Sequence, residues 1–412
     1  MSLNTQIFLG CILGIGLGFL FARLGPEAVI VKNGMFVCGI LGTLFIDLLK
    51  MVLVPLVFTS IAVGVANLSK HSQLHRVWIS TLGFFMVSMT LAIILALLAT
   101  NWLKPGQGLT LDLFQTANQN IAAKQMSFGE FFATFLHGLF INPFAALAQG
   151  NILAIVIFAL FLGIALVVGG ERYRNILLLM QEGQELILRM VGWIMRLAPI
   201  GIFALLAQLL VSQDKAVLVS LLEFVGLVIG TTLLHGFVVL PLLLFVFTKI
   251  PPRKFFWGAR EALLTAFATS SSSATLPVTL RCVEQHLHVK PNIAGFVIPL
   301  GATINMDGTA LYEASAALFI ANLVGVELDL AQQLIVFFTS MLAAVGAPGM
   351  PSAGMITMVM VLQSVGLPAE AIAILLPIDR LLDTFRTMVN VEGDMVGSLI
   401  VQHLVNQNAD FD

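Results

Sequence analysis

The chain has 412 residues, of which 58% are hydrophobic and only 10% are charged. Soluble domains carry about 25% charged residues, so this composition excludes a water-soluble globule and predicts a polytopic membrane protein. The formal net charge of -2 excludes a nucleic-acid partner, because no basic face is available to neutralise a phosphate backbone. The three cysteines form no CxxC pair, which argues against a disulfide framework and a zinc site.

The first two thirds of the chain contain long apolar segments. A helix of about 20 apolar residues crosses the hydrocarbon core of a bilayer, and the uncharged segments 5–22, 51–69, 77–103 and 224–248 are long enough. Segment 131–170 is also uncharged, but Asn142, Pro143, Gly150 and Asn151 predict that it breaks. A further span is predicted over 187–210.

The loops around residues 70–76, 172–174 and 249–254 are net basic and fall at alternate connections. Cytoplasmic loops carry the excess of Lys and Arg, so this pattern predicts a cytoplasmic N-terminus.

Two polar interruptions mark the last third of the chain. The first is the serine run 269–277, and the second is the Gly- and Pro-rich segment 346–354, which divides the charge-free run 330–369. No straight helix passes through Pro348, Pro351 and three glycines in nine positions. We interpret both as tips of re-entrant helical hairpins; the alternative is two polar loops outside the bilayer.

Each interruption precedes a polar cluster by about 35 residues, Ser270 before Asn305 and Ser352 before Arg386. Paired broken segments of this kind indicate a substrate site near the middle of the bilayer, because half-helix N-termini bind anions and freed carbonyls bind cations.

The first cluster is segment 301–309. In a regular helix Asn305 and Asp307 would point about 200° apart, so a shared role requires local unwinding, which Gly308 favours. The carboxylate, the amide and bare carbonyls would then offer oxygen ligands suited to a small cation such as sodium. The alternative is that Asp307 pairs with an arginine of a neighbouring helix.

The second cluster is a polar stripe within an arc of about 80° at 100° per residue. It comprises Asp379, Asp383, Arg386, Asn390 and Asp394. An arginine flanked by acids suits a zwitterionic acidic ligand, since guanidinium binds carboxylate and carboxylate binds ammonium. The alternative is a salt-bridge ladder between helices. Glu392 is expected on the opposite side, as a bystander.

Three motifs together resemble the dicarboxylate/amino acid:cation symporter family, which includes archaeal aspartate transporters and mammalian excitatory amino acid transporters. They are the serine-rich first tip, the segment Asn305-Met306-Asp307-Gly308-Thr309, and the segment 383–394 with Arg386-Thr387-Met388-Val389-Asn390. The resemblance extends over the whole chain in span order.

This resemblance implies an all-α membrane protein with eight transmembrane helices, two re-entrant hairpins, inverted repeats and an elevator mechanism. The implied scaffold comprises helices 1–2 in residues 1–70 and helices 4–5 in 127–212. The implied transport domain comprises helix 3 in 76–104 and the core 216–412, which holds helix 6, hairpin 1 at about 256–289, helix 7, hairpin 2 at about 330–366 and helix 8.

The resemblance also implies roles for single residues. Arg386 would bind the substrate side-chain carboxylate and Asp383 the substrate amino group. The other implied substrate residues are Thr309, Thr387, Asn390, Ser272 and Met350. The implied sodium residues are Asp394, Asn305, Asp307, Gly301, Thr303 and Asn390. Candidates for gating or coupling are Gly349, Ser352, Glu313 and Arg380.

The chain departs from the family pattern in three places. The third sodium site normally recruits hydroxyls from the third span, where this chain offers Phe85, Ser88 and Met89. Family members carry an arginine where this chain has Ser270 or Thr384, and Arg380 is a candidate substitute. The pair Tyr312-Glu313 is similar to the mammalian pattern, in which that glutamate is tied to proton or potassium countertransport.

These observations predict a sodium-coupled symporter of aspartate or glutamate. The expected coupling ion is sodium with no organic cofactor, and the expected location is the cell inner (plasma) membrane with both termini cytoplasmic. The family resemblance implies a homotrimer. Alternatives are a proton-coupled carrier of acidic amino acids or C4-dicarboxylates, a neutral amino acid carrier, and a passive channel. An intramembrane hydrolase using Ser270–Ser273 lacks a nearby His base and a GxSxG elbow, so we expect no enzyme.

Overall fold

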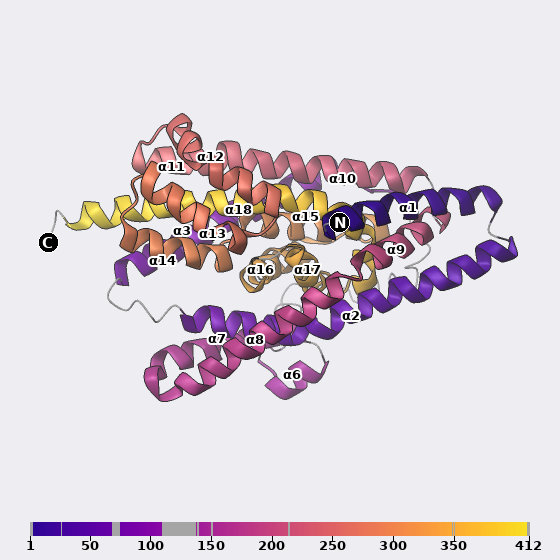
Figure 1. Ribbon diagram of the computed structural model, residues 1–412, viewed down its shortest axis with the longest axis horizontal. Helices are drawn as coiled ribbons and strands as arrows, with labels where there is room; N and C mark the ends of the chain where they lie inside the picture. The colour runs from indigo at the N-terminus through magenta and orange to yellow at the C-terminus, as the bar shows by residue number, and fades with distance from the viewer. Residues whose placement is uncertain are drawn as a thin grey trace.

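The structure is a computed structural model that describes residues 3–25, 27–67, 75–108, 137, 140–149, 151–212, 215–347, 349 and 351–409. These residues form helices and connecting turns, with no β-strand among them (Figure 1).

The helices before residue 250 are α1 (Leu3–Leu24), α2 (Val29–Asn67), α3 (His75–Leu103), α6 (Pro143–Gln149), α7 (Ile152–Gly169), η3 (Gly170–Tyr173), α8 (Arg174–Met195), α9 (Ala198–Ser212), α10 (Lys215–Leu234), η4 (His235–Val239) and α11 (Leu240–Thr248). After residue 250 come α12 (Pro252–Thr269), α13 (Ser272–Arg281), η5 (Cys282–His286), α14 (Pro291–Ile304), α15 (Asp307–Val324), α16 (Leu330–Gly346), α17 (Ala353–Ser364), η6 (Ala369–Ala371) and α18 (Ile372–Ala409).

The helices present an apolar outer surface. Leu13 on α1, Trp102 on α3 and Val168 on α7 are 61%, 84% and 82% exposed, and many other large apolar side chains share this exposure. Apolar surface of this extent is unusual for a protein in water and suits contact with lipid.

Two stretches among the described residues are long and apolar enough to cross a membrane, Arg76–Leu103 and Val219–Thr248. A third is added if the bent run formed by Ile157–Ile194 and Ala198–Gln208 counts as one span. The eight spans that the resemblance implies stay a prediction.

The predicted break in segment 131–170 is present in its described part. Helix α6 begins at Pro143, and α7 begins after Asn151, whose side chain accepts a hydrogen bond from the Ala154 backbone N–H. An asparagine at this position satisfies one of the free N–H groups of a helix start.

The span predicted over 187–210 contains a break between two helices. Helix α8 ends at Met195, α9 begins at Ala198, and the chain bends by 52° between them. Pro199 stands at the second position of α9, where proline favours a helix start but cannot continue a preceding helix.

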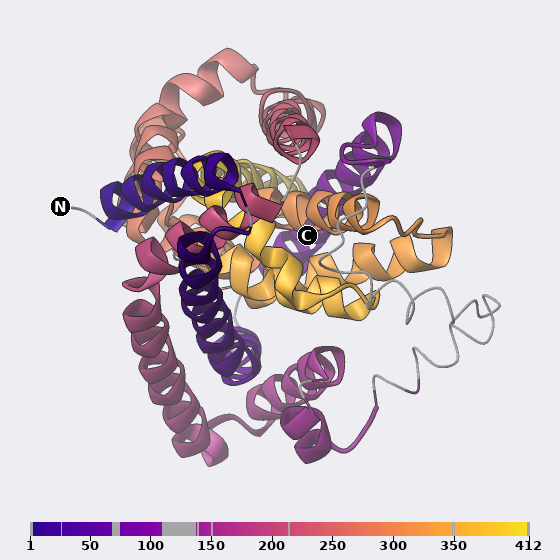
Figure 2. The same ribbon diagram turned by 90° about the vertical axis from the view of Figure 1, so that its right-hand side faces the viewer.

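The helices pack in two sets. Helix α2 packs on α7, α8 and α9, and α1 packs on α9, whereas α18 packs on α12, α14, α15 and α3. Figure 1 shows α2 and α8 along one side of the molecule, with α12, α13 and α14 on the other and α16 and α17 between them. The end-on view in Figure 2 shows the same order, with the golden helices near the centre. Whether the two sets move as the predicted domains stays a prediction.

Helix α15 lies at the centre of the second set. Every residue of α15 is buried except Asn322, and the helix packs against α3, α10, α16, α17 and α18. Polar groups at its start are therefore removed from solvent by surrounding helices.

Each interruption in the last third separates two consecutive helices, α12 from α13 and α16 from α17. Helix α12 has 18 residues and α13 has 10, while α16 has 17 and α17 has 12. At 1.5 Å per residue, α17 is about 18 Å long, and α13 together with η5, which continues it to His286, is about 22 Å long; both are shorter than a hydrocarbon core of about 30 Å.

Candidate functional site

The two turns between these helix pairs meet each other. The Ser271 hydroxyl donates to the Gly349 carbonyl oxygen at 2.7 Å, and the Ser273 N–H donates to the same oxygen at 3.1 Å. A Cβ added to Gly349 would lie 2.7 Å from the Ala302 carbonyl oxygen and 2.5 Å from the Ser273 hydroxyl. Only glycine therefore allows the second turn to approach this closely.

The first turn ends α12 at Ser270, whose φ of 51° is left-handed, and Ser271 then caps α13 by accepting from the Ala274 N–H at 3.2 Å. Ser272 is buried at the first position of α13, where backbone N–H groups of a helix start are free to bind anions. Predicted site residue Met350 lies outside the described residues.

The second turn contacts the last long helix. Ser352, with a left-handed φ of 60°, donates its N–H to Asp383 Oδ2 at 2.8 Å. This bond connects the start of α17 to α18, so the turn and the Asp383 carboxylate are positioned together.

The chain unwinds between α14 and α15, as the sequence predicts. Asn305 and Met306 have extended or irregular backbone angles, and Asp307 begins α15. A Cβ at Gly308 would lie 2.6 Å from the Arg386 carbonyl oxygen, so glycine permits α15 to start directly against α18.

A buried polar network surrounds the unwound segment. Asp307 Oδ1 accepts from the Ser88 hydroxyl at 3.0 Å, and Asn305 Nδ2 donates to Asp394 Oδ1 at 3.2 Å. The Ser88 hydroxyl is also 3.3 Å from Asn305 Oδ1. The side chains of these four residues are buried.

Asn390 joins α18 to the start of α15. Its Oδ1 accepts from the Gly308 N–H at 2.8 Å, and its Nδ2 donates to the Thr309 hydroxyl at 3.3 Å. Gly301 lies against the Asp394 carboxylate, which a Cβ at that position would overlap.

Carboxylate, amide and hydroxyl oxygens thus converge, and such hard oxygen donors fit a small cation. Within the described residues, no group of three or more His, Cys, Asp or Glu side chains could hold a metal ion. A cation here would therefore depend on amide, hydroxyl and backbone oxygens besides the two carboxylates.

Thr303 is not brought into this network. Its side chain is exposed and its hydroxyl donates to the Leu300 carbonyl oxygen at 2.8 Å. The predicted sodium-binding role of Thr303 stays a prediction.

Arg386 is fully buried on α18 between two acids. Its Nη2 donates to Asp379 Oδ1 at 2.7 Å and to Asp383 Oδ1 at 2.8 Å, and its guanidinium lies 4.1 Å from the centre of the Tyr312 ring. Its Nε and Nη1 have no hydrogen-bond partner within the described part of the chain. The guanidinium therefore retains donors for a ligand.

Three more of the predicted site residues are Thr387, Arg380 and Glu313. Thr387 is buried beside Arg386, and Arg380 Nη1 lies 3.5 Å from Asp383 Oδ2, at the long end of hydrogen-bond distances. Glu313 is fully buried and accepts from the Thr357 hydroxyl at 2.5 Å, while its Oε2 has no partner among the described residues.

Sequence reasoning missed three parts of the site. Asp379 was predicted on the polar stripe but not as the partner of Arg386, and His235 was not predicted in the site. Glu392, expected to be a bystander, is buried against Gly236 with Oε1 unpartnered among the described residues. No local motif marks His235, because it meets its partner from a helix 72 residues away.

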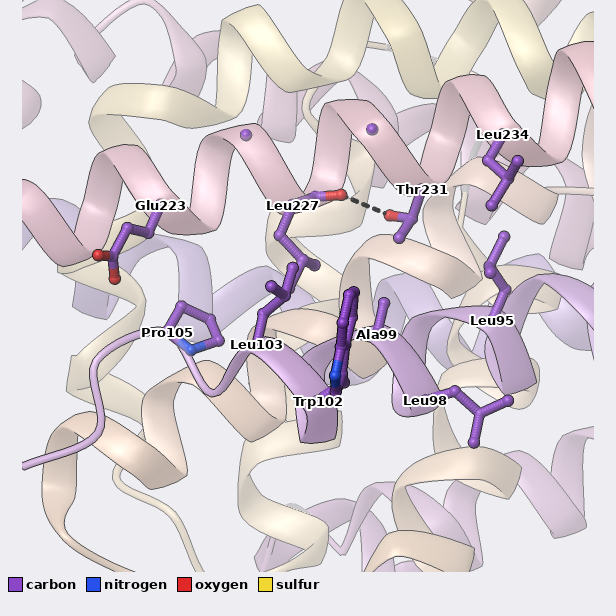
Figure 3. Close-up of a pocket in the computed structure, with 12 residues that line it drawn as sticks. Leu95, Leu98, Ala99, Trp102, Leu103, Pro105, Glu223, Leu227, Thr231 and Leu234 are labelled. Carbon is purple, nitrogen blue, oxygen red and sulfur yellow. Dashed lines mark hydrogen bonds between the residues drawn. The ribbon is translucent and has the colours of Figure 1, made fainter.

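A separate groove of about 910 Å³ lies between α3 and α10 (Figure 3). Its lining is mostly apolar. Glu223 lies at one end, and the Thr231 hydroxyl donates a hydrogen bond to the Leu227 carbonyl oxygen. None of its lining residues belongs to the polar network, so we assign the groove no part in the site.

Comparison with known proteins agrees with the architecture. Residues 3–404 match the model of the sodium:dicarboxylate symporter family. The neutral amino acid transporter B(0) of Mus musculus is 33% identical over 438 residues, covering 96% of this chain and 79% of that protein.

Higher identity occurs over shorter alignments. Excitatory amino acid transporter 4 of Mus musculus is 46% identical over 267 residues, covering 64% of this chain and 47% of that protein. Excitatory amino acid transporter 3 of Mus musculus is 44% identical over 255 residues, covering 62% and 49%. The chain belongs to the sodium:dicarboxylate symporter family, whose members are transporters and not enzymes.

Proposed function

We propose that this protein is a secondary active transporter that couples the entry of sodium to the uptake of an acidic amino acid, aspartate or glutamate. The observation that carries the proposal is Arg386, a fully buried guanidinium with two unused nitrogen donors between Asp379 and Asp383. Sodium and amino acid transport are also named in the family and its relatives.

The substrate class follows from complementary charges. A side-chain carboxylate of the substrate would bind the free donors of Arg386, since guanidinium pairs with carboxylate through two parallel hydrogen bonds. The substrate ammonium would bind Asp383, whose Oδ2 also accepts from the Ser352 N–H. A neutral amino acid would leave Arg386 without this carboxylate, and a C4-dicarboxylate would leave Asp383 without an ammonium.

The need for sodium follows from the balance of buried charge. Among the side chains that the structure describes, the buried acidic ones are Asp307, Glu313, Asp379, Asp383, Glu392 and Asp394. The buried basic side chain among those described is Arg386. A zwitterionic aspartate adds a further net negative charge. Charges in a low-dielectric region interact strongly, so binding is favoured when cations neutralise Asp307 and Asp394.

The short helices support re-entrant hairpins that stop at the middle of the bilayer. Helix α17, and α13 with η5, are too short to cross it, and the two turns meet at Gly349 beside the unwound segment. We propose that the second turn is the extracellular gate, with Gly349 and Ser352 as its moving parts, and that the transport domain moves as an elevator in a homotrimer with cytoplasmic termini.

The experiment is uptake of radiolabelled aspartate and serine into proteoliposomes, with sodium and proton gradients imposed separately. The proposal expects aspartate uptake that depends on the sodium gradient. Uptake of serine in preference to aspartate would indicate a neutral amino acid carrier, and uptake of aspartate driven by the proton gradient alone would indicate proton coupling.

A further inference from the structure

His235 lies at the buried polar network around Asp307 and belongs to none of the three sequence motifs. Its ring Nε2 is 3.1 Å from Asp307 Oδ2, and both side chains are 0% exposed. An imidazole in direct contact with a predicted cation ligand, out of reach of solvent, requires an explanation beyond general packing.

A local change of helix type positions this side chain. Helix α10 continues into η4, a π-helical turn over His235–Val239, before the α-helical pattern resumes in α11. Such π-bulges insert one residue into a helix and occur often at functional sites.

Close packing from α18 fixes the same turn. Gly236 follows His235, and a Cβ there would lie 2.9 Å from Glu392 Oε2 and 3.0 Å from Val389 Cγ2. Glycine therefore allows α18 to rest directly on η4, and the backbone that carries the imidazole has little freedom to shift.

The chemistry of the two groups identifies the hydrogen-bond donor in the contact between His235 and Asp307. A carboxylate accepts hydrogen bonds and cannot donate them, so with Asp307 ionised the proton lies on His235 Nε2. The other oxygen of Asp307 accepts from the Ser88 hydroxyl at 3.0 Å. The two oxygens of this carboxylate thus accept hydrogen bonds from two different elements, Oδ2 from η4 and Oδ1 from α3.

We propose that His235 is a positioning residue for a cation bound at Asp307, an inference that rests on the proposed function. The imidazole is not a sodium ligand, because sodium prefers oxygen donors. It fixes Oδ2, so that Oδ1 is presented to the cation when Ser88 releases or shares it. Residues that orient a metal-binding carboxylate or imidazole typically change metal affinity about 10–100-fold when replaced.

The chain offers matched variants. In His235→Gln the terminal amide nitrogen can reach the place of Nε2 and donate to Asp307, whereas His235→Asn is too short and His235→Leu has no donor. Thr232→Val is the control, since Thr232 is buried on the same helix and its hydroxyl has no hydrogen-bond partner among the described residues.

The measurements are the sodium dependence of the thermal unfolding midpoint without amino acid, and the sodium dependence of aspartate affinity by calorimetry. We expect His235→Leu and His235→Asn to raise the half-saturating sodium concentration about 10–100-fold. His235→Gln should stay within about threefold of the wild type, and Thr232→Val should be unchanged. At saturating sodium, all four variants should bind aspartate with nearly wild-type affinity.

A merely structural histidine would give another pattern. His235→Leu would then lower the unfolding midpoint equally at every sodium concentration, without moving the half-saturating value, and this result would overturn the proposal. If His235→Leu does not fold, the comparison of His235→Asn with His235→Gln decides in the same way, and equal sodium dependence in these two would overturn it.

The same measurements distinguish failure of the proposed function from failure of the role proposed for His235. If the wild-type protein shows no sodium dependence in either measurement, sodium coupling is wrong and the role of His235 at a cation falls with it. If the wild type depends on sodium and His235→Leu responds identically, only the role of His235 is wrong.

Discussion

The two sets of helices differ in what they bury. Helices α1, α2, α7 and α9 bury apolar side chains and Thr59, whereas the region from α12 to α18 buries Arg386 and several acids. An ionised group inside a membrane costs about 3 kcal/mol on insertion scales, so such groups persist where they bind partners or ligands. The contrast teaches that polarity in this chain is concentrated where we place transport, and that the remaining helices provide apolar packing.

The largest expected effect comes from removing Arg386, the buried guanidinium of the polar region. Arg386→Ala should weaken aspartate binding by about 2–5 kcal/mol, a factor of about 30 to several thousand, because the substrate carboxylate would lose its charged partner. Calorimetry on folded protein at saturating sodium measures this loss. Arg174→Ala is the control from the other region, since Arg174 is exposed and lies 3.8 Å from an exposed Glu171.

Unchanged aspartate affinity in Arg386→Ala would mean that Arg386 is a structural partner of Asp379 and Asp383. The proposed substrate class would then be wrong, although the buried ion pairs would remain as described.

A smaller effect is expected at the meeting point of the two turns. Gly349→Ala should weaken aspartate binding about tenfold, because overpacking typically costs about 1–3 kcal/mol and the added methyl would displace Ser273 or the Ala302 carbonyl. The matched control is Gly295→Ala on α14, where a Cβ would meet nothing within 4 Å. Equal affinity of the two variants would show that closure of the turns does not contribute to substrate binding.

The smallest effect concerns access to the second turn. In a variant whose native cysteines are replaced, Ser352→Cys should be labelled by a membrane-impermeant thiol reagent from outside the cell. Labelling should slow severalfold when aspartate and sodium are present, since the Ser352 N–H is hydrogen-bonded to Asp383 and the proposed gate would close over the substrate. Labelling from the cytoplasmic side alone would contradict both the gate and the predicted orientation.

The sequence predicted local breaks better than it predicted partners. Pro143 and Asn151, the serine run and the Asn305–Asp307 segment all mark helix ends in the structure, because proline, glycine and capping residues act within a few positions. The break before Ala198 was not predicted, although Arg196 and Pro199 stand at it, because the segment 187–210 as a whole is apolar enough to be interpreted as one span.

Contacts within one helix can be predicted from residue spacing, whereas contacts between distant segments cannot. The pair of Arg386 with Asp379 could have been predicted from helical geometry, since the two residues lie two turns apart on one face of α18. The contact of His235 with Asp307 depends on a π-helical turn and on the packing of α10 against α15, neither of which leaves a local signal.

The most direct test of the account is aspartate binding by calorimetry across a sodium series at fixed pH, repeated across pH with choline in place of sodium. The account predicts that affinity rises steeply with sodium and that this dependence weakens in Asp394→Asn, because bound cation and bound substrate must favour each other equally. Affinity that ignores sodium but rises as the solution becomes more acidic would contradict sodium coupling and indicate a proton-coupled carrier.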